Sequence, residues 1–158
     1  MARLRSIRRL LLRARQVDNR RRLLLAEAVA CLLTARFALL FVPFPRLARR
    51  LGTFVAPTDP RATPATMANA DVHVRFAQDI GWAVTRAARY VPFRAVCLPQ
   101  AMAARVMLGR RGVASVMHFG AAMGRQKPID AHAWLDAAGI EVTGYPVAKH
   151  LAEIACFV

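Results

Sequence analysis

The sequence predicts a small α+β domain preceded by a basic, apolar helical segment. Two stretches of the second half, 71–90 and 97–109, carry apolar residues at helical spacing. Three later stretches, 113–123, 131–135 and 140–143, have the composition and alternation of strands. Helices followed by neighbouring strands, rather than a regular alternation of the two, favour α+β over a doubly wound fold.

The chain is long enough for one domain with an appendage, and its charge is unevenly distributed. It has 158 residues, a formal net charge of +15 and 56% hydrophobic residues. Residues 1–50 hold thirteen Arg and only Asp18 and Glu27, so they carry +11 of that charge. Such an arm suits an anionic membrane surface, a nucleic acid or an acidic partner. Because the Arg run lacks interleaved aromatic residues, we expect no nucleic-acid partner.

The N-terminal region, 1–51, is expected to be helical and rich in Arg and Leu. The apolar run 23–44 is long enough to span a bilayer, but Glu27 and Arg36 interrupt it, and such charges are costly at membrane depth. A buried or interfacial helix is therefore favoured, and it could also lie on an anionic membrane surface. We find no convincing cleavable signal peptide.

The rest of the chain divides at its prolines and glycines. Residues 46–51 are expected to form a helical turn, and 52–66, with Pro and Gly among polar residues, a linker. The α+β domain is expected over 67–158. Within it, 138–139 has the composition of a hairpin turn, and the tail 147–157 is expected to form a short helix.

Cys97 is the candidate nucleophile, because it begins a predicted helix. The N–H groups and partial positive charge of a helix N-terminus stabilise a thiolate. His132, in a predicted strand, would accept the thiol proton and later protonate the leaving amine. The backbone N–H of Cys97 would hold the oxyanion, and Gln100 is a weaker polar candidate. On the opposing interpretation, Cys97 is a small core residue and His132 a packed or surface side chain.

Other residues of chemical interest are assigned simpler roles. The three cysteines are odd in number and widely spaced, which argues against a disulfide framework and for a reducing compartment, the cytoplasm. Cys31 and Cys156 are expected to pack, His118 to lie in the core or at the surface, and His150 to be solvated. Because no Cys and His have zinc spacing and no phosphate-binding glycine loop is present, we expect no metal, ATP or other cofactor.

The central stretch resembles a known family, the lasso peptide biosynthesis B2 proteins, which are transglutaminase-like cysteine peptidases. The resemblance implies a transglutaminase- or papain-like core, with the family's Cys and His at Cys97 and His132. It implies a bacterial hydrolase that removes the leader from a ribosomally made precursor peptide. A leader-recognition protein would present that leader, and a macrolactam-forming cyclase would act next. The matching segments are 42–46, 91–101, 107–113, 118–120, 131–135 and 142–146.

The chain departs from this family at the third catalytic residue. The family pattern usually supplies an Asp just past the hairpin that follows the His-containing strand, and no Asp occupies 141–144 here. Asp130 is our first candidate, because side chains two apart on a strand share a face, and Glu141 is the next. A backbone carbonyl or a Thr could also orient the imidazole. On the simpler interpretation, Asp130 is an ordinary loop residue with no catalytic role.

Two further functions are open on the sequence. The chain could be a non-catalytic scaffold that docks a membrane or partner enzymes through its basic helical arm. It could also be a transferase that uses the same acyl-enzyme, because these residues do not determine whether water or an amine receives the acyl group.

Overall fold

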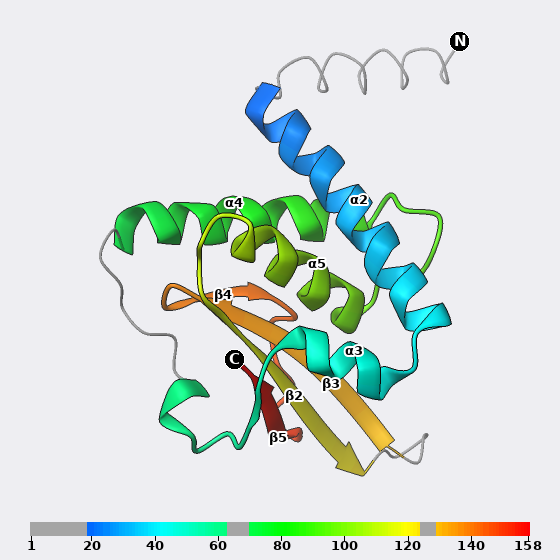
Figure 1. Cartoon of the computed structure of the whole chain (residues 1–158), viewed down its shortest axis with the longest axis vertical. Coiled ribbons are helices and arrows are strands. Elements are labelled where there is room, and N and C mark those ends of the chain that lie inside the picture. The colour runs from blue at the N-terminus through cyan, green and yellow to red at the C-terminus, as the bar shows by residue number, and fades with distance from the viewer. Residues whose placement is uncertain (1–18, 63–69, 124–128) are drawn as a thin grey trace.

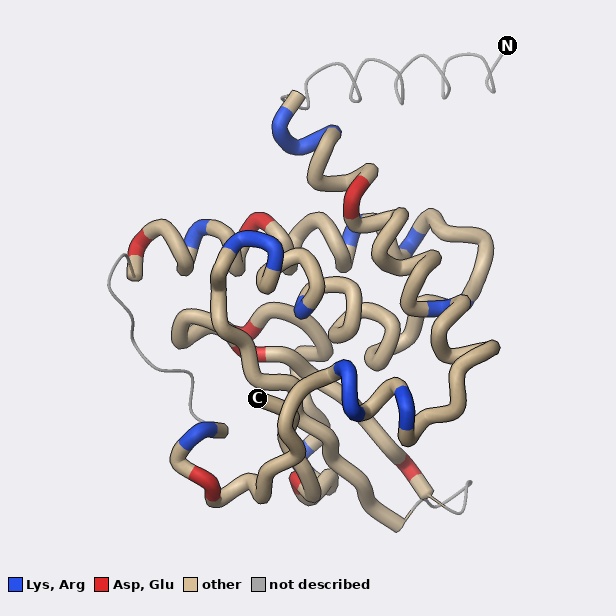
Figure 2. The backbone as a smooth tube through the Cα atoms, in the orientation of Figure 1, with Lys and Arg blue, Asp and Glu red and all other residues tan. Residues whose placement is uncertain are grey.

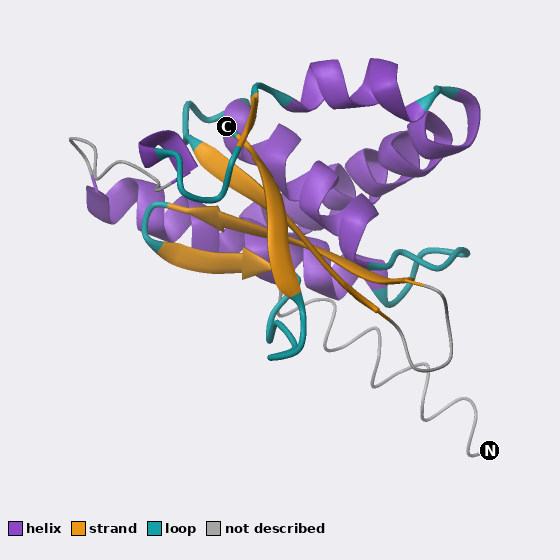
Figure 3. Ribbon diagram, turned by 90° about the horizontal axis from the view of Figure 1, so that it is seen from below, coloured by secondary structure: helices purple, strands orange, loops and turns teal. Residues whose placement is uncertain are grey.

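The chain folds into two layers of helices on one face of an antiparallel sheet (Figure 1). This computed structural model describes residues 19–62, 70–123 and 129–158. Helices α4 (Ala70–Ala88) and α5 (Cys97–Gly109) pack on the sheet, and α2 (Asn19–Phe41) packs on both of them from outside. Viewed from below, the strands form one layer under the helices (Figure 3). The α+β prediction is confirmed.

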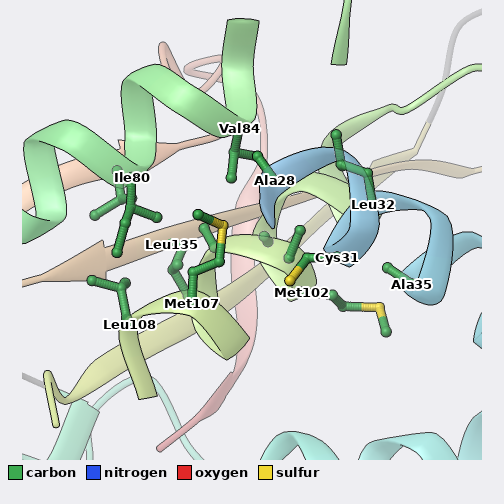
Figure 4. Packing of buried hydrophobic residues seen from close by; sticks show 14 of the residues in the cluster. Ala28, Cys31, Leu32, Ala35, Ile80, Val84, Met102, Met107, Leu108 and Leu135 are labelled. Atoms are coloured by element: carbon green, nitrogen blue, oxygen red, sulfur yellow. The ribbon is translucent and has the colours of Figure 1, made fainter. Parts of the chain in front are cut away.

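Helix α5 is the centre of the core. Its residues 101–104, Met107 and Leu108 are all buried, and so is Pro99 in its first turn. A helix that is apolar on nearly every side must be enclosed, and here α2, α4 and the sheet all pack against it. Figure 4 shows labelled side chains from α2, α4, α5 and β3 that meet in this core. Full burial of one such aliphatic side chain contributes roughly 1.5–3 kcal/mol. The core therefore fixes the end of the helix that carries Cys97.

Helix α2 contributes one apolar stripe to the same core, and its Glu27 forms ion pairs that hold the helix against the end of α5. Glu27 accepts hydrogen bonds from Arg111 at 2.6 Å and from Arg110 at 3.1 Å, both at the end of α5. These arginines lower the pKa of Glu27 despite its partial burial. Helix α2 is long and apolar enough to cross a membrane. The core helix of a soluble protein can have the same length and hydropathy, so these two properties are weak evidence for a membrane span. The buried stripe consists of Leu24, Ala28, Cys31, Leu32 and Ala35.

The five described strands form one sheet in the order β1-β5-β2-β3-β4, with every neighbouring pair antiparallel. One face carries Met117, Leu135 and Ala137 into the helical core. The other face carries Val116 and Cys156 into a second, smaller cluster. The strands are β1 (Phe54–Val55), β2 (Ser115–Met123), β3 (Ile129–Ala137), β4 (Ile140–Thr143) and β5 (Ala152–Phe157).

Several predicted elements are confirmed with small shifts. The short helix α3 (Phe44–Leu51) covers the predicted turn at 46–51, and α4 and α5 match their predicted ranges. The hairpin turn between β3 and β4 is also present, with positive φ at Ala138 and Gly139. Residues 124–128, which separate the strands predicted at 113–123 and 131–135, lie outside the described residues.

The tail is where the sequence-based prediction is wrong. Residues 147–157 were predicted to form a helix, but β5 occupies 152–157 and inserts between β1 and β2. Its hydrogen-bonding partners lie far away in the chain, in β2 and in the segment predicted to be a linker. Part of 52–66 is accordingly ordered, as β1 and the 3₁₀ turn η1 (Pro60–Ala62). Helix α2, from the region predicted at 1–51, shares one core with α4, α5 and the sheet of the domain predicted at 67–158.

Candidate functional site

Cys97 is the first residue of α5, as predicted, and its side chain is half-buried. The preceding residue, Val96, provides no side-chain cap, so the first N–H groups of the helix have no side-chain acceptor there. Gln100 turns back and donates its amide N–H to the Ala95 carbonyl at 2.6 Å, which holds the chain that leads into Cys97. Gln100 therefore supports the loop before the thiol and is not free to act as an oxyanion donor in this arrangement.

His132 lies in the first half of β3, and one of its ring nitrogens has a defined partner. Nε2 lies 2.5 Å from the Gly144 carbonyl oxygen, an acceptor, so Nε2 must carry the proton. Nδ1 is then left with its lone pair, which is the state that a general base requires. The backbone carbonyl just past β4 thus fixes the tautomer of this imidazole.

Gly144 ends the stretch 141–144, within which the family pattern usually supplies an Asp, and its environment excludes a side chain. Its φ is +87°, and a Cβ built there would lie 2.5 Å from the Ala133 carbonyl oxygen and 2.8 Å from Trp134 Cα. An Asp in this backbone conformation would be strained and would collide with β3. The backbone therefore supplies the acceptor that a carboxylate would otherwise provide.

The acidic candidates lie elsewhere. Asp130 Oδ2 is 3.2 Å from His150 Nε2, and both side chains are mostly exposed, so Asp130 pairs with the tail and not with His132. Glu141 is exposed on β4, opposite Asp136 in the register. The carbonyl alternative for orienting His132 is the one that the geometry supports. Sequence reasoning left a backbone carbonyl open as the acceptor but did not identify Gly144, because a backbone acceptor carries no residue-type signal.

No hydrogen bond between described residues joins Cys97 to His132. Arg105, late in α5, donates to the Ser115 carbonyl at the start of β2, so Cys97 is at the other end of a helix about 18 Å long. His132 pairs with Gly120, about 17 Å along β2 from Ser115. The His132 ring stacks near Trp134 on the face opposite α5, and no hydrogen bond links it to Cys97 Sγ among the described residues.

Trp134 connects His132 with a second histidine. The indole lies between two imidazoles, with centroids 5.4 Å from His118 and 6.1 Å from His132. Gly120 makes room for this stack, since a Cβ there would approach Trp134 Cζ3 to 2.9 Å. His118 is buried, as expected for a core residue, but it is also the centre of a polar cluster that the sequence did not reveal.

Two surface pockets lie away from these residues. One is lined by α4 and β4, including Trp82, Arg86 and Glu141. The other lies between α2 and α4, next to Glu27 and Asp79. Neither is lined by Cys97 or His132, so they carry no argument about the thiol.

The fold and the helix-borne thiol agree with the family comparison. Residues 38–156 match the model of the transglutaminase-like superfamily, and the chain belongs to that superfamily. The match begins within α2 and ends in β5, so it includes the helical core as well as the sheet. No curated protein and no solved structure matches this chain. Cys97 and His132 remain the predicted catalytic pair of this domain.

Proposed function

We propose that this protein is a cysteine peptidase that removes the leader from a lasso peptide precursor. The observation that carries the proposal is the hydrogen bond from His132 Nε2 to the Gly144 carbonyl, because it prepares Nδ1 as a base on the strand where the family has its histidine. The superfamily match and the position of Cys97 at a helix start support the same chemistry. The choice of a lasso precursor rests on the resemblance of the central segments.

The reaction would proceed through a thioester. His132 Nδ1 takes the Cys97 proton, and Sγ attacks the scissile carbonyl carbon while the backbone N–H of Cys97 holds the oxyanion. Collapse breaks the C–N bond, and the imidazolium gives its proton to the departing amine. Water, deprotonated by His132, then releases the leader as a carboxylate. Cys97 lies on the helical side of the sheet and the His132 ring on the opposite face, so this step requires β3 or the start of α5 to rearrange when the substrate binds.

The proposed partners are a leader-recognition protein and a macrolactam-forming cyclase. Support for docking comes from α2, where Phe37, Leu40 and Phe41 are exposed on the side away from the core. Arginines of α3 lie close by in the chain (Figure 2). An apolar stripe next to basic residues suits either a partner with an acidic, apolar surface or an anionic membrane surface. We propose a cytoplasmic enzyme that can associate with such a surface.

The test is mass spectrometry of a lasso precursor incubated with this chain and its leader-recognition protein. We expect a free leader fragment from the wild type and none from Cys97→Ala. Cys31→Ala is the matched control, because Cys31 is buried in α2 and far from the predicted chemistry. Cleavage that persists in folded Cys97→Ala would overturn the assignment of the nucleophile.

A non-catalytic scaffold is the second candidate, and the separation of Cys97 from His132 favours it. On this alternative the chain holds its partners through α2 and α3 and leaves cleavage to another protein. Absence of a fragment from the folded wild type with all partners present, together with measurable binding of the recognition protein, would support the scaffold. A leader recovered joined to an added amine would instead indicate a transferase.

A further inference from the structure

A second group of functional side chains lies on the face of the sheet opposite α5. His118 Nδ1 is 2.5 Å from Glu153 Oε1, Cys156 Sγ is 2.9 Å from the same oxygen, and Sγ is 3.5 Å from Nδ1. The three potential ligand atoms lie within 4.8 Å of one another. His118 and Cys156 are buried, whereas Glu153 is exposed, so the group has one side open to solvent.

An irregularity in the sheet creates this group. Residues 153 and 156 are three apart, and in a regular strand they would point to opposite faces. The register between β2 and β5 shifts here, since Phe119 faces Ala155 while the next residue, Gly120, faces Glu153. One extra residue of β5 is accommodated, which brings Glu153 to the same face as Cys156. Bulges of this kind commonly re-aim side chains at functional sites.

We propose that His118, Glu153 and Cys156 form a binding site for a divalent metal ion of the zinc type. One imidazole nitrogen, one carboxylate oxygen and one thiolate sulfur match the ligands that zinc takes, with a fourth position left for water. The described residues offer no fourth side-chain ligand at this position, and the exposed Glu153 side gives a path for the ion and for water. The site is distinct from the predicted Cys97–His132 pair, so it does not depend on the proposed function.

The surroundings of His118 have the arrangement expected behind a metal ligand. Its other nitrogen, Nε2, is 3.4 Å from Asp136 Oδ2 and makes no hydrogen bond of good geometry. Asp136 in turn accepts a hydrogen bond from the Tyr145 hydroxyl. A carboxylate next to the non-ligating nitrogen fixes a metal-binding histidine in the required tautomer. Here Asp136 would keep the proton on Nε2 and leave the Nδ1 lone pair toward the ion.

A second catalytic triad is the competing interpretation of these residues, and the burial of the thiol argues against it. Cys156 is fully buried, so a substrate carbonyl has no access to its sulfur. A fully buried thiol of this kind is a poor nucleophile near neutral pH. A metal ion would replace the thiol proton, which is released to solvent. Glu153 would have to move outward, because two ligands about 2.0 Å from one zinc ion lie more than 2.5 Å apart.

Titration of the full-length chain with cobalt(II), after treatment with a chelator, tests the site. We expect one ion per chain and a thiolate-to-cobalt charge-transfer band, displaced by zinc(II). The band should disappear in Cys156→Ser and persist in Cys97→Ala. Asp136→Asn should keep the band but weaken zinc affinity by about 10- to 100-fold.

Glu153→Gln provides a variant at an exposed position, for the case that Cys156→Ser does not fold. It should also lose tight binding while retaining the circular dichroism of the wild type. Absence of the band in the folded wild type, or a band that survives Cys156→Ser, would overturn the proposal. These outcomes are independent of leader cleavage, which is measured separately.

Discussion

The predicted Cys97–His132 pair and the group formed by His118, Glu153 and Cys156 differ in how the cysteine and the histidine are held. Cys97 is half-buried at a helix start, without a hydrogen bond to any described residue, and His132 has one partner. Cys156 is completely buried and bonded to Glu153, next to a histidine with carboxylates on both nitrogens. An accessible thiol and an imidazole with a free nitrogen are what a nucleophile and its base require. A buried thiol whose sulfur lies close to a carboxylate oxygen and an imidazole nitrogen is better suited to bind a metal ion. The environment of a cysteine and a histidine therefore determines which chemistry the pair can support.

The largest expected effect comes from removing the His132 imidazole. His132→Ala should lower the rate of leader cleavage by about 1000-fold, because the general base is lost. Single-turnover kinetics with the precursor would measure this. Asp130→Asn is the matched control on the same strand and should change the rate little, since Asp130 pairs with His150. A large loss in Asp130→Asn would show that the carboxylate acts on His132 after all.

Gly144→Ala should be the next largest change. The positive φ and the contact with the Ala133 carbonyl should lower the free energy of unfolding by about 3 kcal/mol. Denaturant unfolding would measure it. Gly139→Ala is the control: its φ is also positive, at +75°, but nothing lies within 4 Å of a Cβ there. An equal loss of unfolding free energy in the two variants would mean that the close approach of Gly144 to β3 does not affect stability.

The two cysteine environments predict different reactivity. Under native conditions iodoacetamide should modify Cys97 at least about ten times faster than Cys31 or Cys156, which are buried. Burial also raises the pKa of Cys31. Peptide mapping by mass spectrometry after short exposures would give the three rates. Faster labelling of Cys156 would reverse the assignment of the two sites.

A smaller effect concerns the ion pairs between Glu27 of α2 and the arginines at the end of α5. Glu27→Gln should cost about 1 kcal/mol at neutral pH, because Arg110 and Arg111 lose a charged acceptor. The folded-state pKa of Glu27 is lowered, so its contribution is present above the ordinary value of 4.5 and is lost as the pH falls through the folded value. The difference from the wild type should therefore vanish in acid.

Asp79→Asn is the control for this measurement, because its pair with Arg20 is longer, 3.5 Å, and more exposed. It should change the free energy of unfolding less than Glu27→Gln does at neutral pH. A difference between the wild type and Glu27→Gln that is independent of pH would show that packing, not charge, explains the effect.

The sequence alone determined the elements whose signals are local. Periodicity predicted α4 and α5, the Ala138–Gly139 turn predicted the β3–β4 hairpin, and the helix start at Cys97 followed from the proline pattern around it. The resemblance in the central segments predicted the superfamily, which the comparison confirms.

Only the tertiary structure decided the pairings between distant residues. The tail became β5 because β1 and β2 offered it hydrogen-bonding partners more than thirty residues away, and no local pattern encodes such pairing. The acceptor for His132 is a backbone carbonyl, which has no residue-type signature. The absence of a metal cluster was inferred from local Cys and His spacing, and that argument does not apply to His118, Glu153 and Cys156. They meet through a register shift between two strands, which exists only once the sheet has formed.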